Sequence, residues 1–269
     1  MTVDGRAAVL GSPIEHSLSP VLHLAAYRAL GLNWDYGRFE VTREELAGFV
    51  AELDDLWRGL SLTMPLKEEA LACAARSDEV ALLAQSANTL VRSPEGEWCA
   101  FNTDVFGIVE SIRHVAPERR CEEALILGAG ATARSAIVAL RDLGVGQVTV
   151  AARRPEAARG IAELAEECGI TCVPVDIVPV VYEVGLVVST LPADAAAPWA
   201  RVAPGFGDAV LLDVTYAPWP TTLARSWHGP VARGADLLLW QATEQVRLMT
   251  GREAPVGAMR EALEGYPQS

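Results

Sequence analysis

The chain has 269 residues, and its 35 acidic residues against 22 basic ones give a formal net charge of -13. This charge is unfavourable for sequence-independent nucleic-acid binding, which needs clustered cations to neutralise phosphates, and for docking on anionic membranes. The hydrophobic fraction of 51% with 21% charged residues is typical of a folded chain with a substantial core. Of the 22 basic residues, 21 are arginine, and Lys67 is the single lysine.

No run of apolar residues approaches the ~20 that a membrane-spanning helix needs, and residues 1–6 lack the basic and then apolar pattern of a signal peptide. We therefore expect a soluble, cytoplasmic protein, as a monomer or a homodimer. The five cysteines are scattered without a CxxC spacing, and the four histidines form no ligand pair. Neither a disulfide framework nor a metal site is predicted.

Short apolar runs alternate with segments of helical periodicity along the whole chain, which predicts an α/β fold with mainly parallel sheet. In the first part, helices are expected over residues 20–30, 43–53, 65–75 and 103–114, and strands over 7–10, 36–41, 60–64, 86–92 and 98–101, the last two as a hairpin. After a polar bridge at residues 117–120 the alternation begins again. Helices are expected there over 131–143, 155–168 and 237–250, and strands over 124–127, 148–152, 171–175, 184–190 and 209–214.

A glycine-rich turn follows the expected strand at residues 124–127. Residues 128–133, GAGATA, have the GxGxxA spacing of a dinucleotide-binding turn between a strand and a helix. The first glycine permits the tight turn, the second lets the backbone approach a pyrophosphate, and the helix N-terminus offers its N–H groups to the phosphates. The alternative interpretation is a tight strand-to-helix turn without a ligand.

The end of the next strand bears on the choice between NAD and NADP. NAD-binding folds place an acidic residue there for the ribose 2′-hydroxyl, whereas this strand is followed by Arg153 and Arg154. Guanidinium groups suit a 2′-phosphate, so NADP is favoured over NAD. The alternative is that both arginines are solvent-exposed residues at the start of a helix.

Four polar clusters precede the glycine turn, each placed at the carboxyl end of an expected strand, where open α/β sheets bind ligands. Their hydroxyl, amide, amine and carboxylate groups describe a site for a small polyhydroxylated ligand. The clusters are EHSLSP at residues 15–20, SLTMPLK at 61–67, SANT at 86–89 and NTD at 102–104. Structural interpretations remain open, because the serines could cap the first helix and Thr63 with Pro65 could serve a strand-to-helix junction.

Together with the glycine turn, these clusters make the chain resemble the shikimate dehydrogenases. The resemblance covers nearly the whole chain and includes, in the family's order, GSPIEHSLSP, SLTMPLK, SANTL, NTD, GAGATA, VVSTLPA, DVTYAPWPTTL and LLLWQATEQ. It implies an oxidoreductase for the NADP-dependent, reversible reduction of 3-dehydroshikimate to shikimate in the biosynthesis of chorismate and the aromatic amino acids. It also implies a substrate domain over residues 1–103 with 238–269 and a Rossmann-like NADP domain over 104–237.

The resemblance also implies roles for individual residues. Lys67 and Asp104 would form the catalytic acid–base pair. The implied substrate contacts are Ser17, Ser19 and Tyr216 at the carboxylate, and Thr63, Asn88 and Gln241 at ring hydroxyls. The implied NADP contacts are Gly128, Ala129, Gly130, Ala131, Thr132, Arg153, Arg154, Thr190 and Gly234. One departure is Ser61, where family members often carry Asn.

Two other functions are compatible with the same motifs. One is a paralogue that acts on quinate or on an amino analogue of dehydroshikimate, with NAD as an option for its cofactor. The other is a non-catalytic NADP-binding sensor, and the intact pair of Lys67 and Asp104 weighs against it. The single lysine points the same way, because the arginine used at every other basic position cannot be deprotonated near neutral pH.

Overall fold

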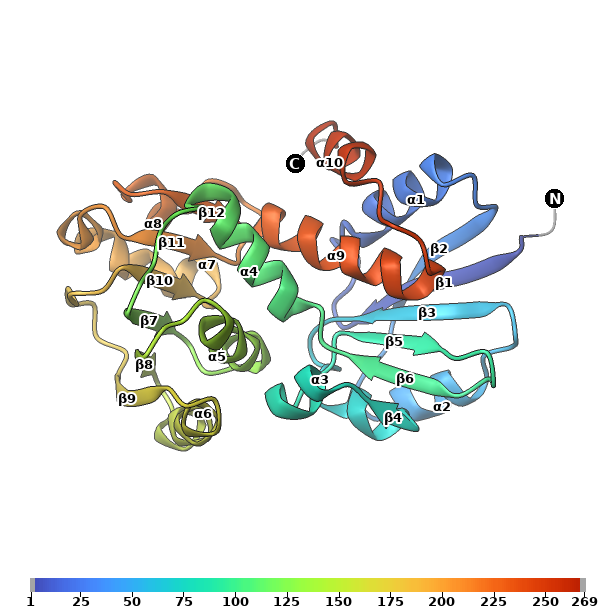
Figure 1. The fold of residues 1–269 in the computed structure, drawn as a ribbon, viewed down its shortest axis with the longest axis horizontal. Helices are drawn as coiled ribbons and strands as arrows, with labels where there is room; N and C mark the ends of the chain where they lie inside the picture. The colour runs from blue at the N-terminus through green and yellow to red at the C-terminus, as the bar shows by residue number, and fades with distance from the viewer. Residues whose placement is uncertain (1–2, 267–269) are drawn as a thin grey trace. The chain divides into compact units, whose positions relative to one another are not determined.

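The computed structural model describes residues 3–266 and divides them into two compact units (Figure 1). The first unit contains the described residues up to Thr103 together with those from Gln241 onward, and the second unit spans Asp104–Trp240. Each unit has its own six-stranded sheet. Within residues 3–266, no helix is both long and apolar enough to cross a membrane.

The sheet of the first unit is mixed, with the strand order β2-β1-β3-β5-β6-β4. β1 pairs in parallel with β2 and β3, whereas β5 is antiparallel to both β3 and β6. The start of β5 therefore lies at the same edge of the sheet as the ends of β1 and β3. The strands are β1 (Gly5–Gly11), β2 (Trp34–Glu40), β3 (Trp57–Leu62), β4 (Arg76–Ser77), β5 (Thr89–Arg92) and β6 (Trp98–Phe101).

The helices of the first unit come from both ends of the chain. α1 begins with a proline in its first turn and packs against α10, as Figure 1 shows, although more than 200 residues separate the two helices. The core of this unit is formed by fully buried side chains such as Leu10, Leu60 and Leu90. The helices are α1 (Ser19–Ala29), α2 (Leu46–Ala51), the 3₁₀ helix η1 (Glu69–Cys73), α3 (Glu79–Ala84), the second half of α9 (Gly234–Thr250) and α10 (Val256–Glu264).

The second unit has an all-parallel sheet with the strand order β12-β11-β10-β7-β8-β9. This is the order of a Rossmann fold, and it confirms the predicted α/β class with a Rossmann-like part. The central strand β7 is fully buried over residues 124–127, as expected of a parallel strand covered on both faces. The strands are β7 (Glu123–Leu127), β8 (Gln147–Ala152), β9 (Thr171–Asp176), β10 (Leu186–Ser189), β11 (Val210–Asp213) and β12 (Val231–Arg233).

The longer helices of the second unit follow the predicted periodicity. α5 and α6 begin and end within one residue of the predicted bounds. The unit also contains two single-turn helices that the sequence did not predict, α7 and α8. Its helices are α4 (Asp104–Val115), α5 (Ala131–Asp142), α6 (Pro155–Glu167), α7 (Ala193–Ala196), the 3₁₀ helices η2 (Ala197–Arg201) and η3 (Ala203–Phe206), α8 (Thr222–Arg225) and the first half of α9.

The predicted helix over residues 65–75 is wrong. Lys67 lies in a turn, and only the short η1 follows it. The Lys67 carbonyl accepts a hydrogen bond from Ala87 N at 2.7 Å, so this oxygen serves a distant strand connection rather than an α-helical turn. The elements β4, α3, β12 and α10 were not predicted either. α3 nevertheless carries a recognisable start signal, because Asp78 accepts a hydrogen bond from Ala81 N as its N-cap.

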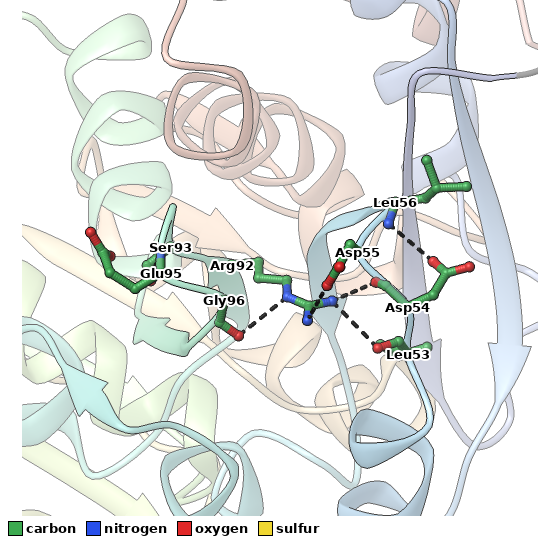
Figure 2. Close-up of polar contacts among 8 residues, drawn as sticks. All are labelled: Leu53, Asp54, Asp55, Leu56, Arg92, Ser93, Glu95 and Gly96. Atoms are coloured by element: carbon green, nitrogen blue, oxygen red, sulfur yellow. Dashed lines mark hydrogen bonds and ion pairs between the residues drawn. The ribbon is translucent and has the colours of Figure 1, made fainter.

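Arg92 ties the hairpin of β5 and β6 to the loop that precedes β3 (Figure 2). Its guanidinium donates to the carbonyl of Gly96 at 3.2 Å and to the carbonyls of Leu53 and Asp54, and it forms an ion pair with Asp55 at 2.9 Å. Such a planar donor group satisfies several acceptors in one fixed arrangement. The contacts connect the turn of the hairpin to residues 53–55.

Candidate active site

The glycine turn connects β7 to α5 as predicted. Gly128 has φ +109°, a conformation that favours glycine, and a Cβ on it would clash with Thr190 Oγ1. Thr190 in turn donates to the Leu127 carbonyl at 2.9 Å, which fixes it against the turn. Gly130 is the N-cap of α5, and no side chain caps this helix. The first backbone N–H groups of α5 therefore point toward the turn without a side-chain acceptor.

A pocket opens beside this turn within the second unit. Arg153 and Arg154 line it with exposed side chains from the end of β8, and Ile177 and Leu191 contribute apolar surface. The other lining residues are Gly128, Ala129, Gly130, Ala152 and Ala157. Among the described residues, no carboxylate lines this pocket. Two cations, uncapped helix N–H groups and apolar walls suit the phosphates and the base of a nucleotide. The residues present therefore fit the adenosine side of NADP.

Gly234 lies against the segment that carries Tyr216. A Cβ on Gly234 would clash with the Val214 carbonyl oxygen, so only glycine permits this backbone approach at the start of α9. Asp213, the last residue of β11, accepts from Thr215 N at 3.1 Å and shapes the same segment. Two predicted ligand contacts, Tyr216 and Gly234, thus belong to one locally packed region of the second unit.

Ser17 and Ser19 lie at the start of α1, at the carboxyl end of β1. Ser17 Oγ accepts from Ser19 N at 3.3 Å, and Ser19 is buried. The N-cap position is Leu18, and no side chain caps the helix. The structure therefore does not support capping as the role of the two serines. The Arg38 guanidinium donates to the Ser17 carbonyl at 2.9 Å and holds this loop on β2.

The segments that carry Thr63, Lys67 and Asn88 lie side by side. Leu62 N donates to the Asn88 carbonyl, and Ala87 N to the Lys67 carbonyl, both at 2.7 Å. Asn88 precedes β5 rather than following a strand, which corrects the predicted position. It reaches the ligand-binding edge because β5 runs antiparallel to β3.

Asn88 is the centre of a cluster of buried amides and hydroxyls. Its Oδ1 accepts from Thr103 N at 2.8 Å, and its Nδ2 donates to Gln241 Oε1 at 3.3 Å. Asp104, the first residue of the second unit and of α4, is 6% exposed. Its pairing with Lys67 stays a prediction. Within residues 3–266, no group of three or more His, Cys, Asp or Glu side chains could hold a metal ion.

The sequence did not show that a buried polar layer adjoins Asn88, although two members of this layer, Ser61 and Thr89, belong to the predicted polar clusters. The layer contains His23, Tyr36, Ser61, Thr89 and Gln245, all within the first unit. The ring of His23 stacks on that of Tyr36 with centroids 4.1 Å apart, and burial lowers the pKa of His23 to about 4. Gln245 follows Gln241 by one helical turn and ends the segment LLLWQATEQ, but the sequence indicated no role for it.

Comparison with known proteins places these residues in a family context. A family model described as the shikimate dehydrogenase substrate binding domain matches residues 9–90, and one described as the shikimate 5′-dehydrogenase C-terminal domain matches residues 234–264. A protein of Rubrobacter xylanophilus named shikimate dehydrogenase (NADP(+)) is 33% identical, with 98% of each chain covered.

Solved structures agree over the same length. The crystal structure of a shikimate 5-dehydrogenase from Mycobacterium fortuitum is 45% identical, with 97% of this chain and 99% of that chain covered and a TM-score of 0.85. The shikimate 5-dehydrogenase of Thermus thermophilus, solved in complex with NADP(H) and shikimate, is 32% identical, with 97% and 98% covered and a TM-score of 0.82.

Proposed function

The chain belongs to the shikimate dehydrogenase family, and we propose that it catalyses the NADP-dependent, reversible reduction of 3-dehydroshikimate to shikimate. This reaction is a step in the biosynthesis of chorismate and the aromatic amino acids. The observation that carries the proposal is the nearly full-length similarity to an enzyme solved with both NADP(H) and shikimate. We assign substrate binding to residues 1–103 with 238–269 and NADP binding to 104–237, of which residues 1–2 and 267–269 lie outside the described part.

The cofactor residues follow from the pocket beside the glycine turn. Arg153 and Arg154 would hold the 2′-phosphate, and the turn of Gly128, Ala129, Gly130, Ala131 and Thr132 would hold the pyrophosphate at the start of α5. Thr190 would lie near the ribose next to the nicotinamide, and Gly234 near the nicotinamide itself. When bound, NADPH supplies the hydride.

The substrate residues are those at the carboxyl edge of the first sheet, with Tyr216 added. Ser17, Ser19 and Tyr216 would bind the carboxylate of the substrate. Thr63, Asn88 and Gln241 would bind its ring hydroxyls, and the Asn88–Gln241 contact of 3.3 Å supports a shared role for the two amides. Buried amides of this kind discriminate against analogues that lack the matching hydroxyl.

Lys67 and Asp104 would carry the proton. Reduction of a ketone needs a proton at the developing alkoxide, and a lysine ammonium can deliver it and later take it back as an amine. Asp104 would orient Lys67 and accept a hydrogen bond from a substrate hydroxyl. Lys67 lies in a turn ahead of η1 and is not part of a helix.

Turnover assays with two substrates and two cofactors test the proposal. We expect shikimate with NADP⁺ to give the highest kcat/KM. A clear preference for quinate with NAD⁺ would instead identify the paralogue. NADPH binding with no turnover of any of these substrates would identify the sensor.

Variants of Lys67 test the mechanism. Lys67→Ala and Lys67→Arg should each lower kcat by about 100-fold or more, because neither side chain can exchange a proton near neutral pH, while NADPH binding is retained. Turnover of Lys67→Arg near the wild-type rate would remove Lys67 from the proton transfer.

We also propose a cytoplasmic location. It is consistent with the five cysteines, all of which are free thiols within the described residues.

A further inference from the structure

A row of hydrogen bonds crosses the interior of the first unit and ends at two of the proposed substrate residues. We call it the Gln245 row; its members are Ser19, Tyr36, Ser61, Gln245, Thr89, Asn88 and Gln241. The links are Tyr36 to Ser61 (2.6 Å), Ser61 to Gln245 (2.8 Å), Gln245 to Thr89 (2.9 Å), Thr89 to Asn88 (2.9 Å) and Asn88 to Gln241 (3.3 Å). Tyr36 is also hydrogen-bonded to the Ser19 side chain. All seven side chains are buried.

Backbone groups fix the direction in which this row donates. Gln245 Nε2 donates to the Asn88 carbonyl at 3.3 Å, and a carbonyl can only accept, so Gln245 Oε1 must be the acceptor for Ser61. Ser61 has a single hydroxyl proton and donates it to Gln245 Oε1. Tyr36 therefore donates to Ser61, and Ser19 donates to Tyr36.

The other end of the row is fixed in the same way. Thr103 N can only donate, so Asn88 Oδ1 is the acceptor and Asn88 Nδ2 is the donor to Gln241 Oε1. The Nε2 group of Gln241 is then the donor that this amide presents on its other side. All hydrogen bonds of the row therefore run in the same direction, with each residue donating to the next one from Ser19 to Gln241.

The hydrogen bond between His23 and Gln245 agrees with this direction. Its Nε2 lies 3.1 Å from Gln245 Oε1, which already serves as an acceptor, so the neutral ring carries its proton on Nε2. Nδ1 then accepts from the Tyr27 hydroxyl at 3.4 Å. Gln245 is thus the residue at which contacts from α1, β3 and β5 meet.

We propose that Gln245 is a positioning residue for substrate recognition: through Thr89 and Asn88 it orients the Gln241 amide so that its nitrogen donates to an oxygen of the substrate ring. The inference rests on the proposed function, because it refines how that reaction's substrate is held. Gln245 lies one helical turn beyond Gln241 on α9 and acts through its neighbours rather than by touching the substrate.

Gln245→Met tests the proposal, because methionine preserves the approximate volume and removes both hydrogen-bonding groups. We expect the KM for shikimate to rise about tenfold, with kcat changed much less and the KM for NADP⁺ within about twofold of wild type. Tyr27→Phe is the matched control. It removes a buried hydroxyl from the same cluster but outside the row, and it should leave the shikimate KM unchanged.

Gln245→Glu supplies a second readout that a purely structural role would not produce. A protonated Glu can accept from Ser61 and donate toward Thr89, whereas the carboxylate opposes the Asn88 carbonyl. We therefore expect the shikimate KM of this variant, relative to the same protein with Gln245, to fall as the pH is lowered. The titratable groups that face this position are His23 and, through Ser61, Tyr36. In the wild type both remain neutral between pH 6 and 9, because burial lowers the pKa of His23 to about 4 and raises that of Tyr36 far above its usual range. A carboxylate at position 245 would raise the pKa of His23, so the measurement is made with Gln245→Glu in a His23→Gln background and compared with His23→Gln alone.

The outcomes separate the two proposals. Wild-type protein that does not turn over shikimate contradicts the proposed function. Active wild type combined with an unchanged shikimate KM in Gln245→Met contradicts the positioning role. If Gln245→Met does not fold, a pH-independent KM ratio in Gln245→Glu contradicts that role instead.

Discussion

The hydroxyl group of Thr221 donates a hydrogen bond to Asp213 across 2.6 Å, and the same oxygen accepts from Ala224 N at 3.0 Å as the N-cap of α8. Asp213 is fully buried, and this burial raises its pKa while the hydrogen bonds from Thr221 and Thr215 lower it. This hydrogen bond therefore joins the last residue of β11 to the N-cap of α8, and the segment between them forms a closed loop. Tyr216 lies inside that segment.

Thr221→Val should loosen this segment. The change leaves a buried carboxylate short of a donor, so we expect the free energy of unfolding to fall by about 1–3 kcal/mol, together with a higher KM for shikimate because Tyr216 is less well held. Urea denaturation and steady-state kinetics measure the two effects. Thr222→Val is the control, since Thr222 is an exposed neighbour. Equal losses in both variants would show that the Asp213 contact is unimportant.

Arg153→Ala and Arg154→Ala address cofactor choice. If these guanidinium groups bind the 2′-phosphate, at least one variant should raise the KM for NADP⁺ about 10- to 100-fold and change the KM for NAD⁺ little. Arg159→Ala removes an exposed arginine of α6 that does not line the pocket, and it should leave both constants unchanged. A parallel rise for NAD⁺ and NADP⁺ would contradict the 2′-phosphate assignment.

The two glycines of the turn should respond differently to alanine. Gly128→Ala combines a strained φ with a clash against Thr190 Oγ1, so we expect a less stable protein even without cofactor. Gly130→Ala meets no atom within 4 Å, so the protein should keep its stability and bind NADP⁺ less tightly, because the phosphates approach the backbone there. Thermal melts with and without NADP⁺ distinguish the two results, and equal melting temperatures of the two apo variants would contradict this division.

The lowered pKa of His23 predicts a specific pH dependence of the free energy of unfolding. Its pKa falls from 6.5 to about 4 on folding, so the unfolded chain binds a proton below pH 6.5 that the folded chain does not bind until about pH 4. The contribution is complete above pH 6.5 and is lost between pH 6.5 and 4, by about 3 kcal/mol in total. The difference in unfolding free energy between wild type and His23→Gln over this range isolates the effect from the carboxylates. A constant difference would show that His23 titrates normally.

Ser17 and Ser19 should contribute unequally to carboxylate binding. Ser19 donates its proton into the Gln245 row, whereas Ser17 Oγ accepts from Ser19 N and keeps its proton for another partner. We expect Ser17→Ala to raise the shikimate KM about tenfold and Ser19→Ala to raise it less. A larger effect of Ser19→Ala in steady-state kinetics would reverse the assignment.

Local signals predicted much of this fold from the sequence. The second unit follows its periodicity closely, because strand, glycine turn and helix succeed one another within a few residues there. The failure at residues 65–75 has a non-local cause, since the Lys67 carbonyl pairs with Ala87, 20 residues away. The role of Gln245 could not be recognised for the same reason. Its partners His23 and Ser61 are 222 and 184 residues distant in the chain.

The packing of α10 on α1 has a consequence for how the chain folds. The strands of the first unit are synthesised first, yet helix surface that covers them comes from residues after Gln241. Asp104–Trp240 is continuous, so we expect it to fold on the ribosome while the first unit still lacks its last two helices. Residues 3–103 are synthesised before Asp104–Trp240, and we expect them to complete their fold after it.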